Sequence, residues 1–146
     1  MLADSLKTLL ANSYAFTIKA QQFHWNVEGP NFPQYHEFFG DLYGEVYASI
    51  DKTAEYIRTL DSYAPGSLER FAELSQIQGQ VKIPRAELMF AELQHDNNII
   101  LECLNHCIGF AKQENAFGIE NYLAERIDAH AKHGWMLRAT LKKERA

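Results

Sequence analysis

Two histidines and two carboxylates in the first half of the chain have the residue types and the spacing of metal ligands. His24 and His36 flank the dipeptide Gly29-Pro30, which indicates a turn because glycine permits a positive φ and proline cannot continue a helix. We therefore expect His24 near the end of one helix and His36 near the start of the next, on one surface of a helical hairpin. Asp51 and Glu55 are four residues apart, so on a helix they share a face and can chelate one cation.

On a single helix the two pairs are too far apart to share one ion. His36 and Asp51 are separated by fifteen residues, which corresponds to about 22 Å along a helix that rises about 1.5 Å per residue. Either the pairs are unrelated half-sites, or the chain pairs with a copy of itself. A two-fold axis across the middle of the second helix would set His24 and His36 of one chain against Asp51 and Glu55 of the other, twice per dimer.

This ligand set favours iron, manganese or zinc, because it combines imidazole with carboxylate and contains no sulfur. Of these, a ferrous ion with open positions can pass an electron to peroxide or oxygen, whereas zinc cannot. Each residue alone also has a simpler explanation: a histidine near a helix end is commonly a cap, and an acid pair at this spacing commonly faces solvent. From the residues alone, the four therefore remain candidates for one shared metal site or for two half-sites.

Four long helices must position these residues, since strand signals are nearly absent and apolar residues recur at helical spacing. The periodicity predicts helices over about Leu2–Val27, Pro33–Leu60, Arg85–Glu114 and Phe117–Lys142. The connection from Asp61 to Ile83 is long, so it can return the chain to the end at which the second helix began, and its apolar positions predict a short helix near residues 68–75. We expect one all-α domain, residues 1–146, folded as a four-helix bundle with one long crossover.

Composition limits the partners. The net charge of −5, with Lys7 as the only basic residue among the first ten, argues against a nucleic-acid surface, so DNA binding is not expected. No apolar run approaches the roughly 18 residues of a membrane helix, and the first residues do not have the pattern of a signal peptide. Cys103 and Cys107 lie four apart on a predicted helix, which favours two reduced thiols in the core and a cytoplasmic location.

The motif Gln-x-His-Trp at 22–25, followed by His36, Asp51 and Glu55 at 12, 27 and 31 residues after His24, resembles the Dps family of mini-ferritins. Weaker similarity continues to the segment ERIDAHAKHGWML at 125–137. The resemblance implies a ferritin-like four-helix bundle whose crossover carries a short helix at the two-fold interface. It also implies a homo-oligomer, a hollow dodecamer built from two-fold dimers.

The activity that this resemblance implies is that of a ferroxidase and iron store. Fe(II) would bind His24 and His36 of one chain and Asp51 and Glu55 of its neighbour. It would be oxidised to Fe(III), preferably by hydrogen peroxide, and stored as a ferric mineral that protects against oxidative damage. Trp25, for which packing in a core or interface is the simpler explanation, would have an accessory role beside the iron. The alternative is a DNA-compacting protein, or a shell with a vestigial iron site.

Two features bear on the metal count. Many members of the family carry an aspartate four residues after the second histidine, and this chain has Gly40 there. A Gly40→Asp change is therefore expected to add a ligand for a second iron ion. A ferritin-type site inside one bundle would need two Glu-x-x-His motifs, and the chain offers one, Glu92 to His95. The count therefore favours the site shared between subunits.

Overall fold

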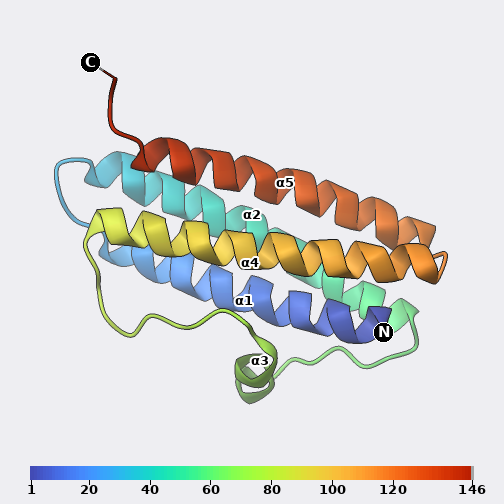
Figure 1. The fold of residues 1–146 in the computed structure, drawn as a ribbon. Coiled ribbons are helices and arrows are strands. Elements are labelled where there is room, and N and C mark those ends of the chain that lie inside the picture. Colours follow the sequence, from blue (N-terminus) through green and yellow to red (C-terminus); the bar gives the residue numbers. More distant parts are fainter. Residues whose placement is uncertain (146) are drawn as a thin grey trace.

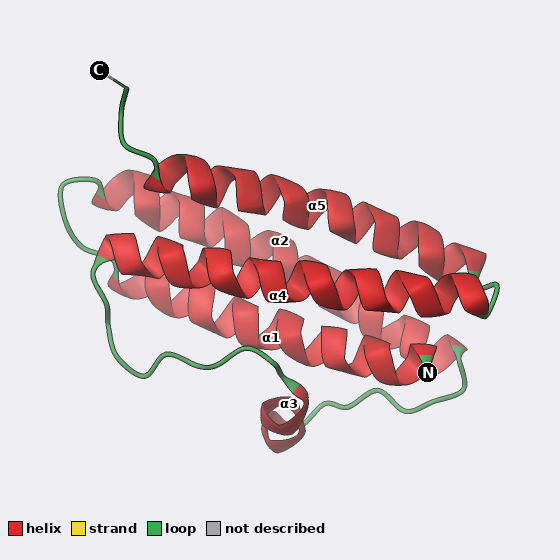
Figure 2. Ribbon diagram, in the orientation of Figure 1, coloured by secondary structure: helices red, strands yellow, loops and turns green. Residues whose placement is uncertain are grey.

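Four long helices and one short helix make up the fold of the computed structural model, which describes residues 1–145. The elements are α1 (Leu2–Asn26), α2 (Phe32–Thr59), α3 (Leu68–Leu74), α4 (Ala86–Gln113) and α5 (Phe117–Leu141). Within the described residues there is no strand, as Figure 2 also shows. The expected all-α class is confirmed, and each long helix ends within one residue of its predicted bounds.

The long connection between α2 and α4 sets the topology. Figure 1 shows that it runs back along the bundle and carries α3 on the outside, so α4 begins at the end where α2 began. Hydrogen bonds from side chains of α1 hold this connection against the bundle. Asn12 Oδ1 accepts one from the Gln76 backbone N–H at 2.7 Å, and Lys19 Nζ donates one to the Gln78 carbonyl at 3.1 Å. The predicted single-crossover bundle is therefore the observed one.

The core is built from the apolar stripes of the four long helices. Phe16, Phe23, Phe39 and Phe90 are its largest fully buried side chains, and Phe39 and Phe90 pack with ring centroids 4.7 Å apart. Burying aromatic surface of this size is the main force that holds such a bundle together. On α5, Leu123 and Leu137 belong to this core, whereas Ala131, which lies between them in the same helical stripe, is exposed to solvent.

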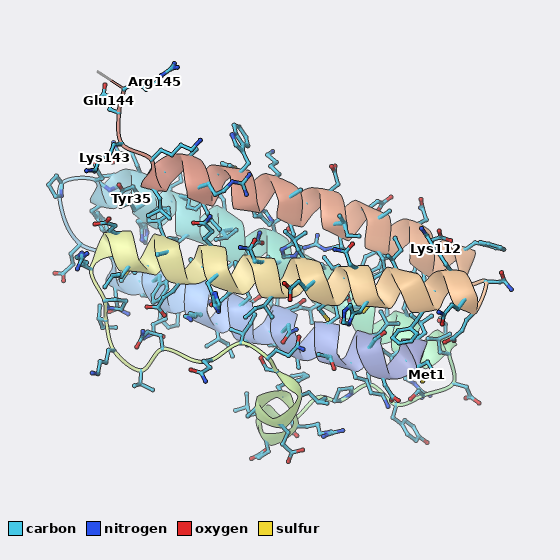
Figure 3. The ribbon with its side chains drawn as sticks, in the orientation of Figure 1. Met1, Tyr35, Lys112, Lys143, Glu144 and Arg145 are labelled. Atoms are coloured by element: carbon cyan, nitrogen blue, oxygen red, sulfur yellow. The ribbon has the colours of Figure 1, made fainter. Side chains whose placement is uncertain are left out.

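The two ends of the bundle differ in what they carry. Figure 3 shows Met1 and Lys112 at one end, where the α4–α5 turn meets the start of α1, and Tyr35 with the C-terminal Lys143 at the other. The backbone N–H of Leu2 donates a hydrogen bond to Glu114 at the first end. The α1–α2 hairpin closes the second end, and it carries both candidate histidines. No helix of residues 1–145 combines the length and apolarity needed to cross a membrane.

Candidate metal centre

The hairpin between α1 and α2 brings His24 and His36 together. Gly29 adopts a φ of +121°, which an L side chain rarely adopts, and the Phe32 N–H donates to the Gly29 carbonyl at 3.0 Å to close the turn. Below the turn Phe23 and Phe39 pack at 6.1 Å and fix the two helices against each other. The last turn of α1 and the first turns of α2 are therefore held side by side.

The two imidazoles form a reciprocal pair. Their rings stack with centroids 3.8 Å apart and an interplanar angle of 14°. The Nδ1 atom of each ring lies 2.6 Å from the backbone carbonyl oxygen of the other residue. A carbonyl oxygen can only accept, so Nδ1 carries the hydrogen in both rings and the lone pair of each neutral imidazole lies on Nε2. This is how proteins orient a histidine that binds a metal.

Two more aromatic rings extend the stack. Phe32 lies against His36 with centroids 5.0 Å apart and nearly parallel planes, and Tyr43 lies 5.5 Å from His24 at a tilted angle. Gly40 of α2 lies next to the His24 ring. A Cβ atom added at residue 40 would be 3.0 Å from His24 Cε1 and 3.1 Å from His24 Nδ1. Gly40 therefore leaves the space that the His24 imidazole fills.

Asp51 and Glu55 are not part of this cluster. Both are exposed on the second half of α2, about 22 Å or more from His36 along the helix. Within residues 1–145 of one chain, no three histidine, cysteine, aspartate or glutamate side chains are grouped so that they could hold a metal ion. Trp25 is 64% exposed, so it does not pack in the core of one chain, and packing at an interface stays a prediction. One chain thus presents the four candidate ligands as two separate pairs.

The interior of the bundle holds carboxylates as well, but cationic side chains already neutralise them. Lys19 is 5% exposed and its ammonium lies 2.9 Å from Asp96 and 3.1 Å from Glu92. Burial raises the pKa of Asp96, although the contact with Lys19 opposes that shift. The Glu92 of the single Glu-x-x-His motif is therefore paired with Lys19, beside the long connection between α2 and α4.

A second ionic cluster, partly buried, joins α2 to α5. Arg126 donates to both carboxylate oxygens of Glu45, and His133 Nε2 lies 2.7 Å from the same group. Burial alone would raise the pKa of Glu45, but the hydrogen bonds from His133 and Arg126 and their charges outweigh it and hold the pKa well below its usual range. These contacts argue, independently of motif counting, against an iron centre inside the bundle.

His130 belongs to the same cluster. Its Nδ1 is 2.8 Å from Asn97 Oδ1 and its Nε2 is 3.0 Å from Arg126. Burial, followed by the adjacent charge of Arg126, lowers the pKa of His130 well below 6.5. Both His130 and His133 are buried, which the sequence analysis did not predict. The signal in the sequence was Arg126, which interrupts the apolar stripe of α5 just after Leu123.

Comparisons with known proteins agree with this architecture. Residues 3–146 match the model of the ferritin-like domain. The chain is 33% identical over 129 residues to DNA protection during starvation protein 2 of Bacillus anthracis, covering 88% of each protein.

Solved structures give the same result. The crystal structure of Dps from Staphylococcus aureus has a TM-score of 0.94 and 30% identity, with 98% of this chain and 96% of that chain covered. The Dps protein from Vibrio cholerae O1, described as a member of a broad superfamily of ferritin-like diiron-carboxylate proteins, has a TM-score of 0.93 and 28% identity over 97% and 89% of the two chains. This chain belongs to the Dps family of ferritin-like proteins.

Proposed function

We propose that the protein is a ferroxidase that oxidises Fe(II), with hydrogen peroxide as the preferred oxidant, and stores the ferric product inside a hollow dodecamer. The observation that carries the proposal is the reciprocal imidazole pair. Both Nδ1 atoms are engaged by backbone carbonyls 2.6 Å away, so both Nε2 lone pairs are available before any metal arrives. A pair of surface histidines with no metal role does not need this double restraint.

In the proposed site His24 and His36 anchor the ferrous ion, and Asp51 and Glu55 of a two-fold-related copy complete its ligands. The carboxylates stabilise the higher charge of the ferric product, because oxygen anions bind a more highly charged cation more strongly. Two ferrous ions each lose one electron, the peroxide O–O bond breaks, and two protons are taken up to give two water molecules. Trp25, exposed beside His24, is the proposed accessory residue that takes up stray oxidising equivalents.

The relatives support iron as the substrate in general terms, since the Vibrio cholerae protein is described as a diiron-carboxylate protein. The length of α2 supports a site shared across a two-fold axis. His36 and Asp51 lie about 22 Å apart on one helix, and their residue types belong together around one ion. A copy of the chain that runs antiparallel across the middle of α2 removes the discrepancy and builds two equal sites per dimer.

An anaerobic Fe(II) titration followed by a pulse of hydrogen peroxide tests this function. The expected result is saturable Fe(II) binding and rapid oxidation on the pulse, with both lost in His24→Ala. His106→Ala is the matched control, because His106 is exposed on α4 and lies outside the proposed site. Oxidation by the His24→Ala protein at the wild-type rate, or its loss in His106→Ala alone, would rule out the assignment.

A further inference from the structure

One face of α2 carries four carboxylates that form no ion pair in their own chain. Glu37, Asp41, Asp51 and Glu55 are all exposed, and at 100° per residue they fall within an arc of about 80° on the helix. The ion pairs within residues 1–145 all involve other acidic side chains. This acidic stripe of α2 is therefore a concentration of negative charge with no cationic partner nearby.

The two basic residues on the second half of α2 are engaged away from the stripe. Lys52 Nζ lies over the rings of Tyr56 and Tyr122, at 5.8 and 5.5 Å from their centroids. Arg58 donates a hydrogen bond to the Ser62 carbonyl at 2.9 Å. Because both cations are held by other groups of the same chain, the carboxylates are left to find a positive partner outside it.

The middle of the stripe has room for a second helix. Gly44 and Ala48 are exposed there, and a Cβ atom added at Gly44 would meet nothing within 4 Å in its own chain. The distance between packed helices depends on the side chains at the contact, so small residues allow a close approach. The stripe is also symmetric, since positions 37 and 55, 41 and 51, and 44 and 48 are equally far from residue 46. An antiparallel copy centred on residue 46 would set each carboxylate against a carboxylate of its partner.

We propose that the acidic stripe is a metal-dependent surface for a second copy of the chain, so that divalent cations drive the pairing and metal-free chains pair more weakly. The inference rests on the function proposed above and adds that the metal substrate promotes assembly. Like charges that face each other across the axis repel. A cation held by Asp51 and Glu55 of one chain and by His24 and His36 of the other replaces this repulsion with bonds to both chains.

Metal binding and pairing are coupled because one chain cannot supply the whole ligand set. A single chain offers the ion two imidazoles or two carboxylates, and residues 1–145 bring no three candidate ligands together. An ion that binds paired chains better than single chains shifts the equilibrium toward pairs. With free metal at about 100 times the dissociation constant of a shared site, each site contributes about 100-fold, so the two sites of a dimer lower its dissociation constant by about 10⁴-fold.

Sedimentation velocity measures this coupling, with Zn(II) as the metal because it suits the same ligands and has no redox chemistry. Wild-type protein is stripped of metal with EDTA and then diluted with or without zinc chloride. A fixed, low concentration of guanidinium chloride brings the appearance of single chains into the measurable range. We expect Zn(II) to lower the protein concentration at which half the chains are single by at least about 100-fold, the contribution of one site.

The variant Asp51→Asn/Glu55→Gln gives the sharper comparison, because it keeps the shape of both side chains and removes their charge. Without metal it should pair more tightly than the wild-type protein, since the repulsion across the stripe is reduced, and Zn(II) should no longer strengthen its pairing. The control is Glu125→Gln/Asp128→Asn, which removes the same charge from exposed positions of α5 and should respond to Zn(II) as the wild-type protein does.

The proposal is overturned if Zn(II) leaves the pairing of the wild-type protein unchanged, if the α2 variant pairs more weakly than the wild-type protein without metal, or if the α5 control also loses its response. The wild-type comparison decides alone should the α2 variant lose its helical circular dichroism. The peroxide pulse separates this proposal from the proposed function. Fe(II) oxidation by a protein whose pairing ignores Zn(II) would reject the coupling alone, whereas Zn(II)-driven pairing without Fe(II) oxidation would reject the ferroxidase and retain the metal-dependent surface.

Discussion

Replacing Gly40 with alanine would place a methyl carbon against the His24 imidazole. The new Cβ would lie 3.0 Å from Cε1 and 3.1 Å from Nδ1, closer than an ordinary van der Waals contact of 3.4–4 Å, so the ring must move by a few tenths of an ångström. It cannot move freely, because His36 stacks on it at 3.8 Å and its Nδ1 is hydrogen-bonded at 2.6 Å. The substitution therefore disturbs the imidazole pair directly.

Gly109, in the interior of α4 and away from the proposed two-fold axis, gives the control because a Cβ there meets nothing within 4 Å. Gly109→Ala should stabilise its helix by about 0.5–1 kcal/mol, the usual gain over glycine in a helix interior. Gly40→Ala has the same gain, but an overpacking cost of about 1–3 kcal/mol opposes it. We expect the free energies of unfolding of the two variants to differ by about 1 kcal/mol or more, with Gly109→Ala the more stable.

Chemical denaturation of both variants measures this difference, and anaerobic Fe(II) titration measures its effect on the site. Gly109→Ala should bind Fe(II) like the wild-type protein, while Gly40→Ala should bind at least about tenfold more weakly, equivalent to about 1.4 kcal/mol. Equal stability and equal Fe(II) affinity in the two alanine variants would refute the role given to Gly40 as the space for His24.

Three further outcomes are expected. Because the pKa of His130 is lowered on folding, the unfolded chain takes up a proton below about pH 6.5 that the folded chain does not. The free energy of unfolding should therefore fall toward pH 5, by up to about 1.4 kcal/mol per pH unit. Denaturation across this range should show a weaker dependence of stability on pH in His130→Gln, and an unchanged dependence would contradict the assignment. Lys19→Met should lower the free energy of unfolding by about 3–5 kcal/mol, because it leaves Asp96 buried without its cation. Lys132→Met, at an exposed lysine, is the control. Adding Asp96→Asn to Lys19→Met should recover part of the lost stability. Finally, the net charge of −5 predicts no DNA gel shift at about 150 mM salt, where phosphate contacts are already much weakened, and a persistent shift would show that prediction to be wrong.

The sequence predicts the helices well because each one has a long, regular apolar stripe. Leu6, Leu10 and Phe16 of α1 all prove to be buried, and the helix bounds follow from where such stripes stop. The juxtaposition of His24 and His36 was also predictable, since the Gly29-Pro30 turn makes the two helices an antiparallel hairpin whose adjoining ends lie side by side. Side-chain periodicity and turn chemistry are local properties, and local properties can be read from one sequence.

Contacts between distant segments could not be read in this way. The pairs Lys19–Asp96 and Arg126–Glu45 join helices far apart in the chain, and no spacing rule pairs a cation with one carboxylate rather than another. Gly40 shows the same limit. By comparison with the family it lacks a carboxylate ligand, and Gly40→Asp was expected to add one. The structure shows that a Cβ at this position would lie 3.0 Å from the His24 ring, so the expected gain requires that ring to move aside by a few tenths of an ångström.

The shared site is tested most directly by mixing two inactive proteins. One carries His24→Ala and His36→Ala, and the other carries Asp51→Ala and Glu55→Ala. Alone, each should lack ferroxidase activity, because every site misses half its ligands.

After the two proteins are unfolded and reassembled together, a mixed dimer has one site with no ligands and one with all four. Random pairing makes half the dimers mixed, with one of their two sites intact, so peroxide-driven Fe(II) oxidation should return to about a quarter of the wild-type level. Folded mixed assemblies that regain no activity would contradict a site built from His24 and His36 of one chain and Asp51 and Glu55 of another.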